Sequence, residues 1–137
     1  MPRYWDLMGE YDAETETYSE FAGAHGANPY SPITDGRLVG LRCVPGREAA
    51  TSLINAFAFK LTCPTFAPST QCVVGGAGSG LQTAPALQAG HVDWEVDLPV
   101  RTGQNIKLEG KCMTSDTPVT MSAFLWGLFE TSMSPVR

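Results

Sequence analysis

The stretch that decides the fold is His91-Val92-Asp93-Trp94-Glu95-Val96-Asp97-Leu98. Apolar and polar residues alternate along its whole length. A period of two is typical of a β-strand with one buried face and one solvated face. We therefore expect Val92, Trp94 and Leu98 to point into a core, and the carboxylates between them to face solvent.

The same alternation continues on the C-terminal side of this stretch. A second strand is expected with Ile106, Leu108 and Cys112 on one face, and a third is expected to begin at Pro118. We expect the three strands to form an antiparallel meander, in which Lys107 and Lys111 pair with the acidic face of the first strand.

The third strand differs from the other two because its second half is apolar on both faces. Leu125 and Phe129 lie on one face, while Phe124, Trp126 and Leu128 lie on the other. A strand that is apolar on both faces is expected to lie beneath a second layer or against another subunit.

Upstream of these strands, residues 37–44 are predicted to form a strand. The segment from Arg47 to Cys63 allows two interpretations: a helix from Arg47 to about Ala58, or a short helical turn at 47–52 followed by a strand that ends at Cys63. We favour the second. Five or more strands joined by long loops predict an all-β protein, an antiparallel β-sandwich of the jelly-roll type.

The N-terminal 35 residues differ in charge from the rest of the chain. Residues 1–35 carry one base and seven acids, a net charge of −6, whereas residues 36–137 carry eight bases and seven acids, a net charge of +1. Aliphatic residues are scarce in residues 1–35, but aromatic residues recur along it: Tyr4, Trp5, Tyr11, Tyr18, Phe21 and Tyr30. Rings spaced along an acidic strip suit an extended arm that fills shallow pockets on a neighbour.

The predicted organisation is an arm and linker at 1–35, a sandwich domain at 36–131 and a short tail at 132–137. The predicted interface is these six rings together with Phe124, Trp126 and Leu128.

Composition narrows the classes of partner. Charged residues make up 17% of the chain, below the ~25% usual in soluble domains, and a surface poor in charge favours contact with other chains. The nearly neutral body has no basic stripe, so nucleic-acid binding is not expected. No apolar run reaches the roughly 18 residues of a membrane span, and the N-terminus lacks the order of a signal peptide, so we expect a protein made and kept in a cytoplasm.

No constellation of residues predicts catalysis, a metal or a cofactor. The histidines, His25 and His91, have no second histidine at a ligand spacing, and the four cysteines lack the short Cys-x-x-Cys spacing of zinc or redox sites. Cys43, Cys63 and Cys112 fall in apolar phases and are predicted to be buried thiols. The acidic residues 93, 95 and 97 could bind a hard cation, but solvated strand charges explain them more simply. We therefore expect a protein that is not an enzyme.

The order of these features resembles small virion proteins that decorate or cement phage-like capsids, and minor capsid proteins. The resemblance rests on the aromatic, acidic segment 1–35 and on the closing runs 91–100 and Leu125-Trp126-Gly127-Leu128-Phe129. It implies an N-terminal arm, a β-sandwich body and no catalytic residues. It also implies that the protein forms homo-oligomers and bridges the subunits of a capsid or filament lattice, within a virion assembled in the host cytoplasm.

An alternative function remains open, a β-sandwich that binds a carbohydrate or another ligand. Such a module would use Trp94 or Trp126 as a stacking platform. The alternation of residues 91–98 places Trp94 inward, which gives this alternative little support.

Overall fold

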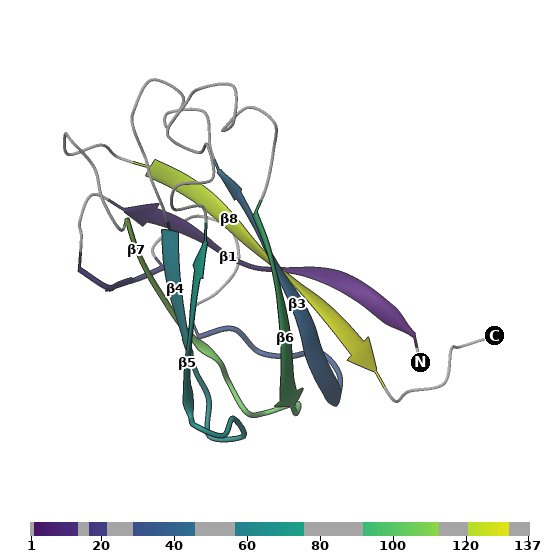
Figure 1. Ribbon diagram of the computed structural model, residues 1–137. Coiled ribbons are helices and arrows are strands. Elements are labelled where there is room, and N and C mark those ends of the chain that lie inside the picture. Colours follow the sequence, from purple (N-terminus) through teal and green to yellow (C-terminus); the bar gives the residue numbers. More distant parts are fainter. Residues whose placement is uncertain are drawn as a thin grey trace.

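The protein is a sandwich of two antiparallel β-sheets (Figure 1). The computed structural model describes residues 2–13, 17–21, 29–45, 57–75, 92–112 and 121–131. These residues form eight strands: β1 (Arg3–Ala13), β2 (Ser19–Glu20), β3 (Gly36–Pro45), β4 (Phe57–Thr62), β5 (Thr70–Gly75), β6 (Val92–Val100), β7 (Lys107–Cys112) and β8 (Met121–Thr131). The described residues contain no helix, so the all-β prediction is confirmed.

The strands pair from the two ends of the chain inward. One sheet has the order β1-β8-β3-β6 and the other has the order β2-β7-β4-β5. The first strand therefore pairs with the last, the second with the seventh, the third with the sixth and the fourth with the fifth. This is the result when a long hairpin that reverses between β4 and β5 rolls up into two facing sheets.

Apolar side chains of both sheets fill the space between them. β8 contributes Leu125 and Phe129, and β4 contributes Phe59 and Leu61, all fully buried. The predicted alternation is confirmed for residues 93–98, because Trp94, Val96 and Leu98 pack against the core while the acids before and between them are exposed. His91 and the side chain of Val92 lie outside the described part of the structure. Cys43 and Cys63 are buried thiols, as predicted, whereas the side chain of Cys112 lies outside the described part of the structure.

The predicted three-stranded meander is wrong. β6 and β8 lie in one sheet, with β3 between them, and β7 lies in the other sheet. The acidic face of β6 therefore pairs with arginines of β3: Arg42 binds Asp93 and Arg37 binds Asp97. Lys107 instead lies 3.3 Å from a carboxylate oxygen of Glu20 on β2. A period of two fixes which face of a strand is buried, but it does not choose the neighbouring strand.

The prediction that residues 1–35 form an arm outside the domain is wrong for the described part of that segment. Residues 3–13 form β1, which pairs with β8 over nearly its whole length, and residues 19–20 form β2, which pairs with β7. Tyr30 pairs through its backbone with Ile106. The domain boundary expected at residue 35 therefore falls inside the sandwich.

The sequence of the segment between β3 and β4 allowed two interpretations, and the structure describes only the C-terminal part of this segment. Phe57–Thr62 is a strand, as the favoured interpretation predicted. The helical turn predicted at 47–52 lies outside the described residues. A strand at 70–75 was not predicted, because six residues with little alternation carry a weak signal.

Candidate functional site

The most unusual surface is the face of the β1-β8-β3-β6 sheet that points away from the core, here called the outer face. β8 runs through the middle of this sheet and places Phe124, Trp126 and Leu128 on the outer face, all half-buried. On β1, Trp5 lies opposite Leu128 and Leu7 lies opposite Trp126. Since residues opposite each other in a sheet project from the same face, these five side chains form one continuous apolar strip.

Trp5 is the most accessible member of this strip. Its side chain is 43% exposed, and in the described part of the chain only Ile33 is a more exposed large apolar residue. The guanidinium carbon of Arg42 lies 4.7 Å from the centre of the indole ring. The same guanidinium donates two hydrogen bonds to Asp93, at 2.8 and 3.0 Å. These hydrogen bonds raise the pKa of Arg42 and hold its planar group against the ring.

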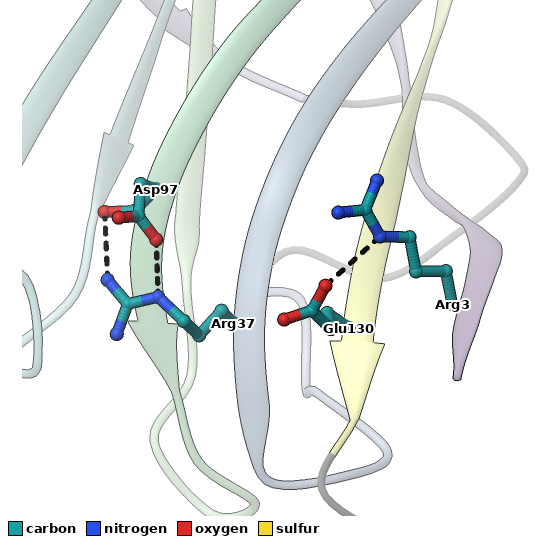
Figure 2. A network of polar contacts seen from close by, with 4 residues as sticks. All are labelled: Arg3, Arg37, Asp97 and Glu130. Carbon is teal, nitrogen blue, oxygen red and sulfur yellow. Dashed lines mark hydrogen bonds and ion pairs between the residues drawn. The ribbon is translucent and has the colours of Figure 1, made fainter. Parts of the chain in front are cut away.

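Ion pairs surround one end of the strip (Figure 2). Arg3 Nε of β1 lies 3.0 Å from Glu130 Oε2 of β8, and Arg37 of β3 binds Asp97 of β6. With the pair of Arg42 and Asp93, this makes three arginine–carboxylate pairs, of which one joins β1 to β8 and two join β3 to β6. Each pair is partly exposed, so it adds little stability.

A hollow lies where β3 carries Gly40. Its volume is about 560 Å³, and its lining includes Arg3, Trp5, Leu128 and Glu95. Gly40 lies opposite Leu128 on one side and Glu95 on the other, so the missing side chain leaves space between an apolar wall and an acidic wall. The hollow therefore offers an aromatic ring, a guanidinium and carboxylates to a molecule that enters it.

Four of the six rings predicted for the N-terminal arm lie elsewhere, in or against the domain's own core. Tyr11, Phe21 and Tyr30 are buried, and Tyr4 stacks on Phe129 with ring centres 5.4 Å apart. Tyr11 and Phe21 pack on each other at 5.2 Å. These four residues stabilise the sandwich and are not available for a neighbouring molecule.

The hydroxyl of Tyr30 is held by a carboxylate. It donates a hydrogen bond to Asp6 Oδ2 from a ring that is only 6% exposed. Burial, followed by the bond to Asp6, raises the pKa of Tyr30 far above its usual range. This contact links the connection before β3 to β1.

Tyr18 lies on the outward face of the other sheet. Lys60 and Lys111 place their ammonium groups 4.3 and 4.5 Å from its ring centre. Burial, followed by the neighbouring Cys72, raises the pKa of Tyr18. The ring therefore covers part of this sheet and is not presented to solvent as an arm would present it.

The structure thus brings together four of the nine predicted interface residues: Trp5, Phe124, Trp126 and Leu128. The sequence analysis missed Leu7, Gly40 and Arg42. Leu7 was missed because residues 1–35 were assigned to an arm. The other two were missed because the hollow and the arginine ladder depend on the β3-β6 pairing, which the meander prediction excluded.

The remaining candidate residues give no assembled site in the described residues. His25 and His91 lie outside the described ranges. Across the described ranges, no group of three or more histidine, cysteine and acidic side chains is arranged to hold a metal ion. Asp93 and Asp97, which were considered as cation ligands, are paired with arginines.

Comparison with known proteins identifies no family for this chain. The sequence matches no protein-family model and no curated protein sequence. In the described part of the chain, no helix has the length and apolar character needed to cross a membrane.

Proposed function

We propose that this chain is a structural assembly protein, a virion decoration or minor capsid protein that bridges neighbouring subunits and performs no catalysis. The observation that carries the proposal is the apolar strip on the outer face. In a sheet with one solvated face, the outward positions of a central strand are ordinarily polar, yet β8 places three large apolar side chains there. An apolar patch rimmed by polar groups is typical of a surface that binds another protein.

The charges around the strip are partly compensated within the chain. Three arginines of the outer face pair with three carboxylates, and Glu95 adds a further acid to the same face. Trp5 is suited to anchor a contact with another chain, because it combines an exposed ring with a fixed orientation against Arg42. The proposed partners are other copies of this chain and the lattice protein of a capsid or filament, in a virion assembled in the host cytoplasm.

The fold supports this proposal by analogy only. Jelly rolls occur in viral capsid proteins, and they occur equally in lectins and cupins. The outer face, and not the fold, therefore carries the argument.

The test is sedimentation velocity on the wild type and on Trp5→Ser. Burying the exposed part of an indole is worth about 1–2 kcal/mol, so the variant should raise the dissociation constant of assembly roughly tenfold. Ile33→Ser is the matched control, because Ile33 is 63% exposed and lies outside the strip. Equal effects of the two substitutions would show that exposed apolar area in general, and not the outer face, drives association.

The hollow over Gly40 favours a second candidate, the binding of a carbohydrate or another small ligand. An exposed indole beside carboxylates and a guanidinium can stack on a sugar ring and bind its hydroxyl groups. Gly40→Val would fill the hollow from its floor, where an added Cβ already meets Leu128 Cβ at 3.4 Å. Isothermal titration with a panel of oligosaccharides should show heat that is lost in this variant. No heat with any member of the panel would remove this candidate.

A further inference from the structure

The four edge strands of the sandwich differ in how well they are protected. β1 carries a bulge between Leu7 and Gly9, and β2 is two residues long. β6 carries three acids and Pro99. Bulges, short length, charge and proline all hinder pairing of an edge with another chain. β5, with the sequence Thr-Gln-Cys-Val-Val-Gly, has none of these features.

The hydrogen-bond pattern shows which groups of β5 are directed away from β4. Cys63 N donates to Ser69 O at 2.9 Å, and these two residues continue the register in which Thr62 lies opposite Thr70. In an antiparallel pair, the groups of alternate residues point to the same side. Ser69, Gln71 and Val73 therefore bond β4, and Thr70, Cys72 and Val74 direct their backbone N–H and C=O groups to the free edge.

The hydrogen bonds of the neighbouring strands β2, β7 and β4 independently give the same alternation of backbone groups along β5. Phe21 N donates to Leu108 O, so Leu108 points toward β2. Glu109 of β7 must then bond Lys60 of β4, which lies opposite it, and this leaves Phe59 and Leu61 to bond β5. No strand in the described part of the structure pairs with the opposite edge of β5.

The free edge of β5 is complementary to itself. When two copies meet antiparallel about a two-fold axis at Cys72, Cys72 faces the partner copy's equivalent and Thr70 faces Val74. All three residues then use their outward groups, which gives about six backbone hydrogen bonds. The strand has no charged side chain, so this pairing brings no like charges together, whereas the acids of β6 would repel one another in the same arrangement.

A cavity beside β5 lies where a strand added by a second copy would cover it. It has a volume of about 350 Å³, lies between the edges of β5 and β6, and is lined in part by Leu61, Val73, Val96 and Leu98. Gln71 and Val73 face this side of the sheet, because they lie opposite the buried residues Leu61 and Phe59. The same two residues of a second copy would extend this inner face and cover the apolar opening.

We propose that β5 of one copy pairs with β5 of a second copy and joins two sheets into one continuous sheet across a two-fold axis. This interface is separate from the outer face and goes beyond the proposed function. A chain with both surfaces can contact two neighbours at once, as a bridging protein must.

Cys72→Pro tests the edge in the full-length chain. It removes the outward N–H of Cys72, which β4 does not use, and proline is tolerated at such positions of an edge strand. We expect a far-ultraviolet circular dichroism spectrum like that of the wild type and loss of the two-fold dimer in sedimentation velocity. A folded variant with the wild-type mass would overturn the proposal, as would a wild type that stays monomeric at its highest attainable concentration.

Oxidation with diamide is a second test that does not depend on the folding of a proline variant. Opposed residues at this type of position have Cα atoms about 5.5 Å apart, within the range of about 4.4–6.8 Å that a disulfide spans. The two Cys72 thiols lose two protons and two electrons to diamide, which becomes the hydrazine. We expect a covalent dimer in the wild type and none in Cys72→Ser.

The matched control places an accessible thiol elsewhere. Ile33→Cys in the Cys72→Ser background has a thiol at an exposed position away from β5. If this control forms dimers as fast as the wild type, cross-linking reports random collision and the proposal is wrong. The proposed function fails separately, since Trp5→Ser tests the outer face and leaves β5 unchanged.

Discussion

Gly127 lies at the centre of β8, at the point where the sheet is most crowded. A Cβ at this position would lie 2.7 Å from Phe129 Cε2 and 2.8 Å from Met8 Sδ. Met8 is the extra residue of the bulge in β1, between Leu7 and Gly9, and its side chain is fully buried. Glycine at 127 therefore makes room for a residue that the bulge turns into the core.

We expect Gly127→Ala to lower the free energy of unfolding by roughly 1–3 kcal/mol, as overpacking of a core does. Gly40→Ala is the control in the same sheet, because its added Cβ meets no atom closer than 3.4 Å. Urea unfolding followed by tryptophan fluorescence measures both. Replacing glycine by alanine lowers the entropy of the unfolded chain and by itself favours folding. Equal losses in the two variants would therefore show that crowding against Met8 and Phe129 does not set the effect.

The contact between Tyr30 and Asp6 predicts a dependence on alkaline pH. The pKa of Tyr30 is raised in the folded protein, so its stabilising contribution is complete below the unfolded value of about 10 and falls as pH rises above it. Tyr30→Phe should therefore cost about 1–3 kcal/mol at neutral pH, and the difference from the wild type should shrink at alkaline pH.

Denaturant unfolding at neutral pH and above pH ~10 measures this difference. Tyr4→Phe is the control, because the Tyr4 hydroxyl pairs with the Thr34 hydroxyl at 2.7 Å and not with a carboxylate. A difference for Tyr30→Phe that stays constant with pH would contradict the assigned hydrogen bond.

At the scale of the elements, β1 determines whether the sandwich is complete. β1 lies beside β8 and covers one of its edges (Figure 1). Its side chains Met8 and Tyr11 are buried in the core. Phe21 and Tyr30, which follow in the same N-terminal segment, are buried as well. Removing this segment would expose an edge of the central strand and open the core.

We therefore expect a chain that lacks residues 1–35 to lose the cooperative unfolding of the wild type. Circular dichroism during thermal unfolding is the measurement. A double substitution, Met8→Ala with Tyr11→Ala, removes the same core contacts without exposing β8 and should cost several kcal/mol while leaving a folded chain. If the truncated chain keeps a sharp thermal transition, residues 1–35 are an arm after all.

The strands that the sequence predicted share one property, a clear period of two. The strands at 36–45, 92–100 and 107–112 and the outward position of Phe124, Trp126 and Leu128 followed from it. β1 was not predicted as a strand, because the bulge at Met8 interrupts the alternation. In addition, its core residues include Tyr11, whose hydroxyl donates a hydrogen bond to Gly110 O. Neither the bulge nor that acceptor can be recognised without the partner strand.

The candidate site was predictable only in part, for a related reason. Period two placed the β8 strip on one face, but the rest of the outer face comes from residues far apart in the chain. Arg42 and Trp5 meet across β8, and Gly40 forms a hollow only because Leu128 and Glu95 lie on either side of it. Strand order, and not local pattern, decides these contacts.

In the whole molecule, two surfaces are proposed for assembly: the outer face of one sheet and the free edge of the other. The outer face supplies apolar area around Trp5, and the edge supplies unused backbone groups of β5. Trp5→Ser removes part of the first source, and Cys72→Pro removes part of the second.

The most direct test of the central claim is the mass of the wild-type chain in solution, measured by light scattering over a wide range of concentrations. The account predicts a mass that rises from the 14.7 kDa of one chain toward defined multiples of it as concentration increases. It also predicts that Trp5→Ser shifts this rise to higher concentration, and that Ile33→Ser does not. A mass of 14.7 kDa at every concentration would contradict the assignment of this protein to self-assembly.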